Sequence, residues 1–250
     1  MGSFTLGAPR AYKRDCGYSY ALGAYAAIEL LKLRPQAARE VYIHSAYENK
    51  PPLIELCERA SVPYRVNDRA LERLSKKESC LVAAAFSPYV DALDAQKPHM
   101  VLVNPSDMGN LGTVFRIAAG FSILDVGIVL PAADVFHPKT VRASMGALFR
   151  VRCGLFESFS QYRGLYPKHG VYPFLLGKKS ALTPESCPKD SLFCLVFGNE
   201  AHGLDDAAFQ RFGTAVRIPQ SALVDSLNLS VAVGIGAYAF AVKNGLVEGG

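Results

Sequence analysis

The second half of the chain is dominated by short apolar runs that alternate with helix-like stretches. These runs are HMVLVN, ILDVGIVLP, VYPFLLG, SLFCLVFG and TAVRIP. Alternating strands and helices are typical of a mainly parallel sheet, and strands without a polar face are buried on both sides. We therefore expect a doubly wound α/β domain, in which ligands bind beyond the carboxyl ends of the strands. Those ends carry Asn104-Pro105, Pro131, Leu176-Gly177, Gly198-Asn199-Glu200 and Pro219-Gln220.

The first half shows the same alternation in a smaller unit. Helical periodicity runs over residues 20–33 and stops before Arg34-Pro35, because a residue that precedes proline is disfavoured in a helix. The following segments are typical of strand, helix, strand, helix and strand: EVYIHSA, PLIELCERA, SVPYRV, NDRALERLSKK and SCLVAAAF. This order again predicts a mainly parallel sheet. The stretch SPYVDALDAQKPH is the best candidate for a linker, so we expect domains at residues 1–95 and 96–250.

The composition excludes several classes of protein. A chain of 250 residues with 50% hydrophobic and 20% charged residues can bury a core and is typical of a soluble globular protein. No apolar run reaches the roughly 18 residues that span a bilayer, and MGSFTLGAPRAYKRD lacks a signal-peptide core. The six cysteines form no CxxC pair and have no histidine at metal-ligand spacing, which favours reduced thiols in a cytoplasm over disulfides or zinc. The net charge of +5 permits a polyanionic partner without indicating one.

A first candidate site is NPSDMGNLGTVFRIAAGF, residues 104–121, which follows a strand and opens a helix near Asn110. The helical period predicts a buried stripe of Leu111, Val114, Phe115, Ala118 and Phe121. Arg116 faces the other way, with Gly112, Ala119 and Gly120. An arginine among such small residues leaves room for a phosphate or another backbone. The alternative is a solvent-facing arginine on an amphipathic helix.

A second candidate site is FGNEAHGL, residues 197–204, directly after an apolar strand. Gly198 permits a tight turn, and Gly203 permits an unusual backbone angle. Glu200, at the carboxyl end of the strand, can accept hydrogen bonds from a ligand or orient another side chain. An ordinary loop between strand and helix remains the alternative.

A third candidate site is IPQSALVDSLN, residues 218–228, which runs into the small-residue helix LSVAVGIGAYAF. Ser226 and Asn228 lie where this helix opens, and the free backbone N–H groups of a helix start can hold a ligand. Serine and asparagine are also ordinary helix caps, and one residue can serve both purposes.

In order and spacing, NLGTVFR, FGNEAHGL and IPQSALVDSLNLSVA resemble the three motifs of the SpoU/TrmH branch of the SPOUT RNA methyltransferases. That family methylates ribose 2′-hydroxyls with S-adenosylmethionine. The segment ASMGALFRV, residues 143–151, is similar to another part of the family, and the resemblance covers roughly residues 99–242. The first half resembles the family's N-terminal substrate-binding domain, which is similar to ribosomal RNA-binding proteins. The resemblance implies a trefoil-knotted C-terminal α/β domain and a homodimer with the cofactor pocket at its interface.

The resemblance also implies the site residues. The catalytic set would be Asn110, Arg116, Glu200, Ser226 and Asn228. By its match to the family's arginine, Arg116 would meet an RNA phosphate and help to remove the 2′-hydroxyl proton. No acidic residue or histidine in the motifs is an obvious base. The cofactor-binding set would be Leu176, Gly198, Ile218, Gln220 and Leu227, and no metal is implied. The chain departs from the family pattern at Gln220 and Ala222, where methionine and glycine are usual, and in the four residues between Pro105 and Asn110.

We therefore predict a cytoplasmic homodimer that methylates a ribose 2′-hydroxyl of structured RNA, with ribosomal RNA favoured over transfer RNA. A catalytically degenerate RNA-binding protein is the main alternative, and the retained site residues argue against it. A Rossmann-type methyltransferase or oxidoreductase would need a glycine-rich turn after its first strand, and none is present there. The Ser-Leu-Asn segment argues against a SPOUT enzyme that acts on a base nitrogen.

Overall fold

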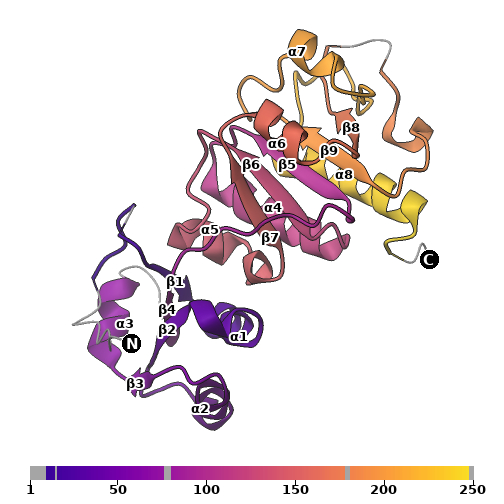
Figure 1. The fold of residues 1–250 in the computed structure, drawn as a ribbon. Coiled ribbons are helices and arrows are strands. Elements are labelled where there is room, and N and C mark those ends of the chain that lie inside the picture. Colours follow the sequence, from indigo (N-terminus) through magenta and orange to yellow (C-terminus); the bar gives the residue numbers. More distant parts are fainter. Residues whose placement is uncertain (1–9, 15, 76–79, 178–180, 248–250) are drawn as a thin grey trace. The chain divides into compact units, whose positions relative to one another are not determined.

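The computed structural model describes residues 10–14, 16–75, 80–177 and 181–247 (Figure 1). The chain forms two compact units, one of Met1–Tyr89 and Phe136–Phe149 and the other of Val90–Val135 and Arg150–Gly250. Most of the N-terminal stretch and Lys76, Lys77 and Ser79, which the predicted helix and strand of that region include, lie outside the described residues. In the part that is described, no helix is long and apolar enough to cross a membrane.

The second unit is built on a five-stranded sheet in the order β7-β6-β5-β9-β8. Its strands are β5 (His99–Val103), β6 (Asp125–Val129), β7 (Arg152–Phe156), β8 (Gly170–Pro173) and β9 (Phe193–Phe197). Every pair is parallel, which confirms the prediction for this half. The order of the strands reverses between β5 and β9, and the crevice at the carboxyl ends of such strands is the usual ligand site.

One predicted strand is absent from the sheet, and one strand of the sheet was not predicted. The run TAVRIP is not a strand of the sheet; only its Val216 forms isolated bridges, to Phe174 and to Leu182. Conversely, β7 was not predicted, because Arg152 and Gly154 interrupt its apolar pattern. Arg152 is tolerated there because its guanidinium pairs with the buried carboxylate of Asp125 on the neighbouring strand, at 2.5 Å.

The helices of this unit are α4 (Met108–Gly120), α6 (Phe159–Leu165), α7 (Asp206–Gln210) and α8 (Leu229–Asn244), with a short 3₁₀ turn at Pro184–Ser186. The stripe predicted for α4 is buried at Leu111, Val114, Phe115 and Ala118, while Phe121 is only half-buried. Gly112 is buried as well, so it does not share the exposed face of Arg116 as predicted. The reason is that α4 packs against α8 as well as against the sheet.

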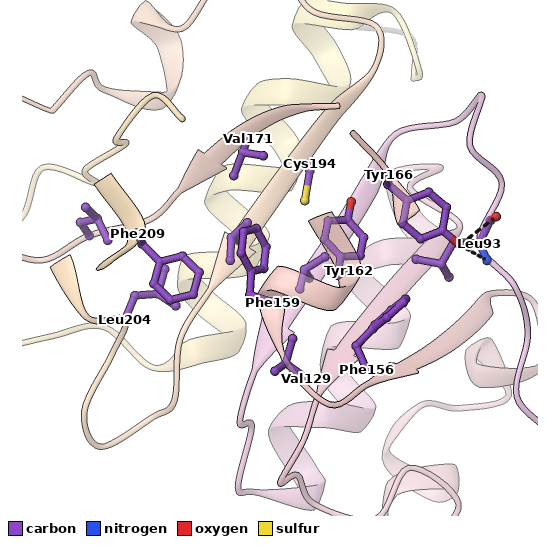
Figure 2. Close-up of a cluster of buried hydrophobic side chains, with 13 residues drawn as sticks. Leu93, Val129, Phe156, Phe159, Tyr162, Tyr166, Val171, Cys194, Leu204 and Phe209 are labelled. Atoms are coloured by element: carbon purple, nitrogen blue, oxygen red, sulfur yellow. Dashed lines mark hydrogen bonds between the residues drawn. The ribbon is translucent and has the colours of Figure 1, made fainter. Parts of the chain in front are cut away.

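In the same unit, α6 supplies two aromatic side chains of the buried core, beside Phe156 of β7 and Phe209 of α7 (Figure 2). Phe159 and Tyr162 are buried, and the ring of Phe159 lies 5.0 Å from that of Phe209. The cluster also contains Leu93 from the stretch predicted as a linker, whose backbone N–H donates to the hydroxyl of Tyr166 at 3.0 Å. Residues 90–98 are therefore anchored to the second unit although they form no helix or strand.

The first unit contains a four-stranded sheet in the order β1-β4-β2-β3. Its strands are β1 (Ser19–Leu22), β2 (Ala38–Ile43), β3 (Tyr64–Val66) and β4 (Val82–Phe86). Its helices are α1 (Ala24–Leu33), α2 (Lys50–Arg59), α3 (Asp68–Leu74) and α5 (Pro138–Ala143), with 3₁₀ turns at Pro35–Ala37 and Ala147–Phe149.

The prediction of a mainly parallel sheet is wrong for this unit. Strand β4 runs antiparallel to both β1 and β2, and only β2 and β3 are parallel. The predicted helix over residues 20–33 is divided by Gly23, whose φ of 100° ends β1 and precedes α1. Local periodicity did not reveal this extra strand, and its pairing with β4 makes the sheet mixed.

The segment of residues 136–149 belongs to this first unit although it lies in the second half of the sequence. Helix α5 packs against β1, and the hydroxyl of Ser19 donates to the carbonyl of Phe136. The Nε of Arg34 donates to the carbonyl of Phe149 at 3.3 Å. The segment ASMGALFRV therefore packs with the first unit over most of its length.

Candidate active site

The three candidate motifs meet at the carboxyl ends of β5 and β9. The loop after β9 is closed by two backbone hydrogen bonds between Asn199 and Gly203, of 3.2 and 2.8 Å. Gly203 has a φ of +66°, which is the kind of unusual backbone angle expected there from the sequence. Gly198 is required for a different reason, since a Cβ there would lie 2.1 Å from the carbonyl carbon of Gly203. The two glycines thus bring the two ends of the loop into direct backbone contact.

The carboxylate of Glu200 is held by donors from the loop after β5 and from the first turn of α4. It accepts hydrogen bonds from the Ser106 N–H at 2.9 Å, the Ser106 hydroxyl at 2.8 Å and the Asp107 N–H at 3.1 Å. The side-chain amide of Asn110 donates to it at 3.3 Å. Burial raises the pKa of the Glu200 carboxyl, but these hydrogen bonds outweigh burial and keep that pKa below its usual range. Glu200 is therefore charged at neutral pH.

Asn110 and Asn228 extend this network to the start of α8. The side-chain amide of Asn228 donates to the Oδ1 atom of Asn110 at 3.1 Å. The Oδ1 atom of Asn228 accepts from the Ser230 N–H at 2.8 Å and from the Ser230 hydroxyl at 2.6 Å, so it caps the helix. Asn228 consequently serves both purposes foreseen for it, as a cap and as part of the polar cluster.

Beside this cluster lies a pocket formed by the end of β8, the loop after β9 and the segment 216–229. All five residues of the expected cofactor-binding set line it, together with Glu200 and Ser226 of the expected catalytic set. The remaining lining residues are Phe174, Leu175, Phe197, Asn199, Ala201, Gly203, Val216, Arg217, Leu229 and Ala232.

Gln220, one of the departures from the family pattern, shapes the loop that follows it. Its side-chain amide donates to the carbonyls of Val224 at 3.5 Å and Asp225 at 3.1 Å. These contacts hold the loop 220–225 closed, while Leu223 at its tip is 93% exposed. A methionine at position 220 could not make them, because a thioether donates no hydrogen bond.

Arg116 is the predicted site residue that neither lines the pocket nor joins the polar cluster of Glu200, Asn110 and Asn228. It is exposed on α4, six residues and so about 9 Å along the helix from Asn110. No side-chain hydrogen bond or ion pair joins it to any residue that the structure describes. Its guanidinium is free to meet a ligand that lies outside the pocket.

Sequence reasoning missed the residues that support the site. Ser106 and Asp107 lie in the four-residue stretch that departed from the family pattern, and their donors fix Glu200. Asn199 links the two loops, since its side-chain amide donates to the Asn104 carbonyl at 2.7 Å. The available signal was the position of Asn199 between Gly198 and Glu200 at a strand end. Within the described ranges, no group of three or more acidic, histidine or cysteine side chains could hold a metal ion.

Comparison with known proteins gives consistent relationships. The sequence model of the SpoU rRNA Methylase family matches residues 97–238. The chain is 25% identical over 176 residues to the 23S rRNA (guanosine(2553)-2′-O)-methyltransferase RlmP of Bacillus subtilis, covering 70% of this chain and 71% of that protein. It is 31% identical over 207 residues to a protein of Archaeoglobus fulgidus named as a tRNA/rRNA methyltransferase, covering 79% and 89%. The fold is similar to the crystal structure of an AdoMet-bound rRNA methyltransferase from Sinorhizobium meliloti, with a TM-score of 0.77 at 22% identity, covering 91% and 87%.

Proposed function

The chain belongs to the SpoU rRNA Methylase family, and we infer that it is an RNA 2′-O-ribose methyltransferase that uses S-adenosylmethionine. Membership confirms the family predicted from the three motifs. The observation that carries the function is the joining of these motifs at one place, where Glu200, Asn110 and Asn228 form a continuous hydrogen-bonded cluster beside a single pocket. The relatives named above as RNA methyltransferases support the same activity.

The residues that line the pocket fit this cofactor. Leu176, Ile218 and Leu227 offer apolar surface for an adenine ring, and Ser226 and Gln220 offer polar atoms. Pockets of this kind, mostly apolar with a few placed polar groups, are typical of cofactor sites. When bound, S-adenosylmethionine supplies a methyl group activated by its sulfonium.

The protein's own contribution is mainly positioning. Aiming a hydroxyl at an activated methyl group requires little acid–base help, and orientation can supply about 7–11 kcal/mol of a reaction barrier. Glu200 acts as a positioning residue and not as a base, because its carboxylate is already engaged by the donors of Ser106, Asp107 and Asn110. Arg116, exposed on α4, binds an RNA phosphate and helps the 2′-hydroxyl to lose its proton.

We further propose that ribosomal RNA is the substrate and that the N-terminal part of the chain, expected at residues 1–95, forms the RNA-binding domain before a methyltransferase domain at 96–250. The compact units differ from these bounds, since the first unit ends at Tyr89 and includes Phe136–Phe149. Exposed cations on the first unit favour this proposal, because phosphate contacts dominate binding to RNA. These cations are Arg10, Lys13, Arg14, Arg69 and Arg73.

A trefoil knot in the second unit is supported by the path of the chain around Val216. The N–H of Val216 donates to the Pro173 carbonyl at 2.9 Å, and the Val216 carbonyl accepts from Leu175 at 2.9 Å. On its other side, the Leu182 N–H donates to Ala215 at 3.0 Å. The segment 214–217 therefore bonds to Pro173 and Leu175 on one side and to Leu182 on the other, and this pairing supports the proposal of a knotted chain path.

A homodimer through α8 and α4 is supported by apolar surface on these helices. Val231 and Tyr238 of α8 are 50% and 58% exposed, and the ring of Tyr238 contacts that of Phe121 edge-on at 6.0 Å. Exposed apolar patches of this kind mark interaction sites. A cytoplasmic location is supported by the six cysteines, all of which are free thiols.

The substrate is tested by mapping 2′-O-methyl positions in total RNA from cells with and without the gene. We expect a ribosomal RNA position to lose its methyl group when the gene is absent. Loss in a transfer RNA with ribosomal RNA unchanged would overturn the choice of substrate, and a methylated base would overturn the choice of ribose. Binding of labelled S-adenosylmethionine separates the enzyme from a degenerate RNA-binding protein, which would show none.

The role of Arg116 is tested by the variant Arg116→Ala. We expect turnover on saturating RNA to fall at least tenfold, because the hydroxyl loses the group that assists proton removal. Near-normal turnover combined with weaker RNA binding would reduce Arg116 to a phosphate contact.

A further inference from the structure

Arg217 is a charged residue of the pocket that none of the motifs assigned. Among the described residues that line the pocket, only Glu200 and Arg217 carry a charge. The backbone of Arg217 is fixed, since its N–H donates to the Leu182 carbonyl at 2.8 Å and the preceding Val216 is buried. The residue is half-buried, and its side chain makes no hydrogen bond or ion pair with any residue of the described ranges.

The two charges of the pocket differ in what they have left to bind. Glu200 is engaged by Ser106, Asp107 and Asn110 and has little capacity for a ligand. Arg217 retains its full set of donors, and a partly desolvated cation is stabilised when an anion enters beside it. The pocket is therefore suited to a ligand that carries a negative group.

Resting on the proposed function, we propose that Arg217 binds the α-carboxylate at the amino-acid end of the cofactor. A guanidinium fork matches a carboxylate in a bidentate pair. The other charged groups of S-adenosylmethionine, its ammonium and its sulfonium, are cations and would be repelled by Arg217. An RNA phosphate is the other anion to consider, but Arg217 adjoins Ile218 in the wall assigned to the cofactor, whereas Arg116 lies outside that wall.

The test compares two ligands that share the adenosine part. S-adenosylhomocysteine has the amino-acid end, and 5′-methylthioadenosine lacks it. Dissociation constants for both are measured by calorimetry on the wild type, Arg217→Gln and Arg217→Lys. The matched control is Arg211→Gln, which makes the same charge change at an exposed residue that does not line the pocket. Thermal unfolding without ligand checks that each variant folds.

We expect Arg217→Gln to weaken the binding of S-adenosylhomocysteine about 10- to 100-fold, which is the loss typical of a charge-assisted hydrogen bond. Arg217→Lys should lose less, and 5′-methylthioadenosine should bind all variants equally. Equal weakening of both ligands would overturn the proposal in favour of a structural role. If Arg217→Gln leaves the affinity for S-adenosylhomocysteine unchanged but weakens the binding of RNA, Arg217 contacts a phosphate instead. If the wild type binds neither ligand, the proposed function itself fails.

Discussion

Single residues of the site are constrained chiefly by the closeness of neighbouring backbone. At Gly198 a side chain would overlap Gly203 and Leu204, with distances of 2.1 to 2.4 Å from the added Cβ. Both contacts are backbone, which cannot move aside as a flexible side chain can. The position therefore admits only glycine if the loop that presents Glu200 is to keep its geometry.

We expect Gly198→Ala to weaken the binding of S-adenosylhomocysteine at least tenfold. It should also lower the free energy of unfolding by about 1–3 kcal/mol, because overpacking forces the backbone apart. Calorimetry and denaturant unfolding measure the two effects. Gly164→Ala is the control, since a Cβ at this exposed position of α6 meets nothing within 4 Å. That change should stabilise the protein by about 0.5–1 kcal/mol. If Gly198→Ala binds S-adenosylhomocysteine as tightly as the wild type, the overlap of a Cβ with the backbone of Gly203 does not disturb the site.

At the scale of elements, the first residues of α8 both stabilise the helix and form part of the site. Asn228 accepts hydrogen bonds from Ser230 as a cap and donates one to Asn110 as a member of the cluster. The accepting and donating atoms belong to different ends of the same amide. Substitutions can therefore separate the two roles.

Asn228→Asp keeps the acceptor that caps α8 and removes the donor to Asn110. We expect its thermal stability to stay close to that of the wild type, while kcat falls at least tenfold. Asn228→Ala removes both, so it should in addition lose about 1 kcal/mol of stability. Melting temperature and kcat are measured together for the two variants. Equal activity of Asn228→Asp and wild type would show that only the cap matters.

At the scale of the whole molecule, a buried histidine pair lies at the amino-terminal edge of the second unit's sheet, away from the site. The rings of His99 and His169 stack at 4.0 Å and both side chains are buried. The Nε2 atom of His99 must donate to the Asp94 carbonyl at 2.9 Å, so its Nδ1 accepts from the Tyr162 hydroxyl at 2.8 Å. Burial, and then the neighbouring His169, lower the pKa of His99 to about 4. Burial also lowers the pKa of His169.

The folded pKa of His99 lies below the unfolded value of about 6.5, so the unfolded chain binds more protons between these values. The contribution of the neutral, buried His99 to the free energy of unfolding is therefore fully present above pH 6.5 and decreases as the pH falls toward 4. We expect about 2 kcal/mol less stability at pH 5 than at pH 7.5, measured by denaturant unfolding. His169→Gln should reduce this dependence, whereas the exposed control His202→Gln should leave it unchanged. A flat profile in the wild type would contradict a neutral buried pair.

The assembly of the molecule is tested on the exposed face of α8. We expect Tyr238→Glu to convert a dimer into a monomer in analytical ultracentrifugation, because a charge in an apolar interface is costly to desolvate. The control is Leu165→Glu at the end of α6, where the leucine is 61% exposed. A monomeric wild type, or a dimeric Tyr238→Glu, would rule out this face as the interface.

The local elements and the motifs can be predicted from the sequence alone. The buried stripe of α4, the positive φ of Gly203 and the strands β5, β6 and β9 follow from neighbours two to four residues apart, and periodicity reports on such neighbours. The motif order was sufficient for the family, and the motifs contain six predicted site residues that the structure places around one pocket; the seventh, Leu176, lies at the end of a predicted strand.

Which distant segments meet cannot be predicted in this way and depends on the tertiary fold. The antiparallel pairing of β4, the joining of residues 136–149 to the first unit and the donors of Ser106 to Glu200 depend on the path of the chain. The hydrogen bonds from Asn110 to Glu200 and from Asn228 to Asn110 span 90 and 118 residues. No local pattern encodes partners so far apart, because their approach is set by how strands and helices bury their apolar faces together.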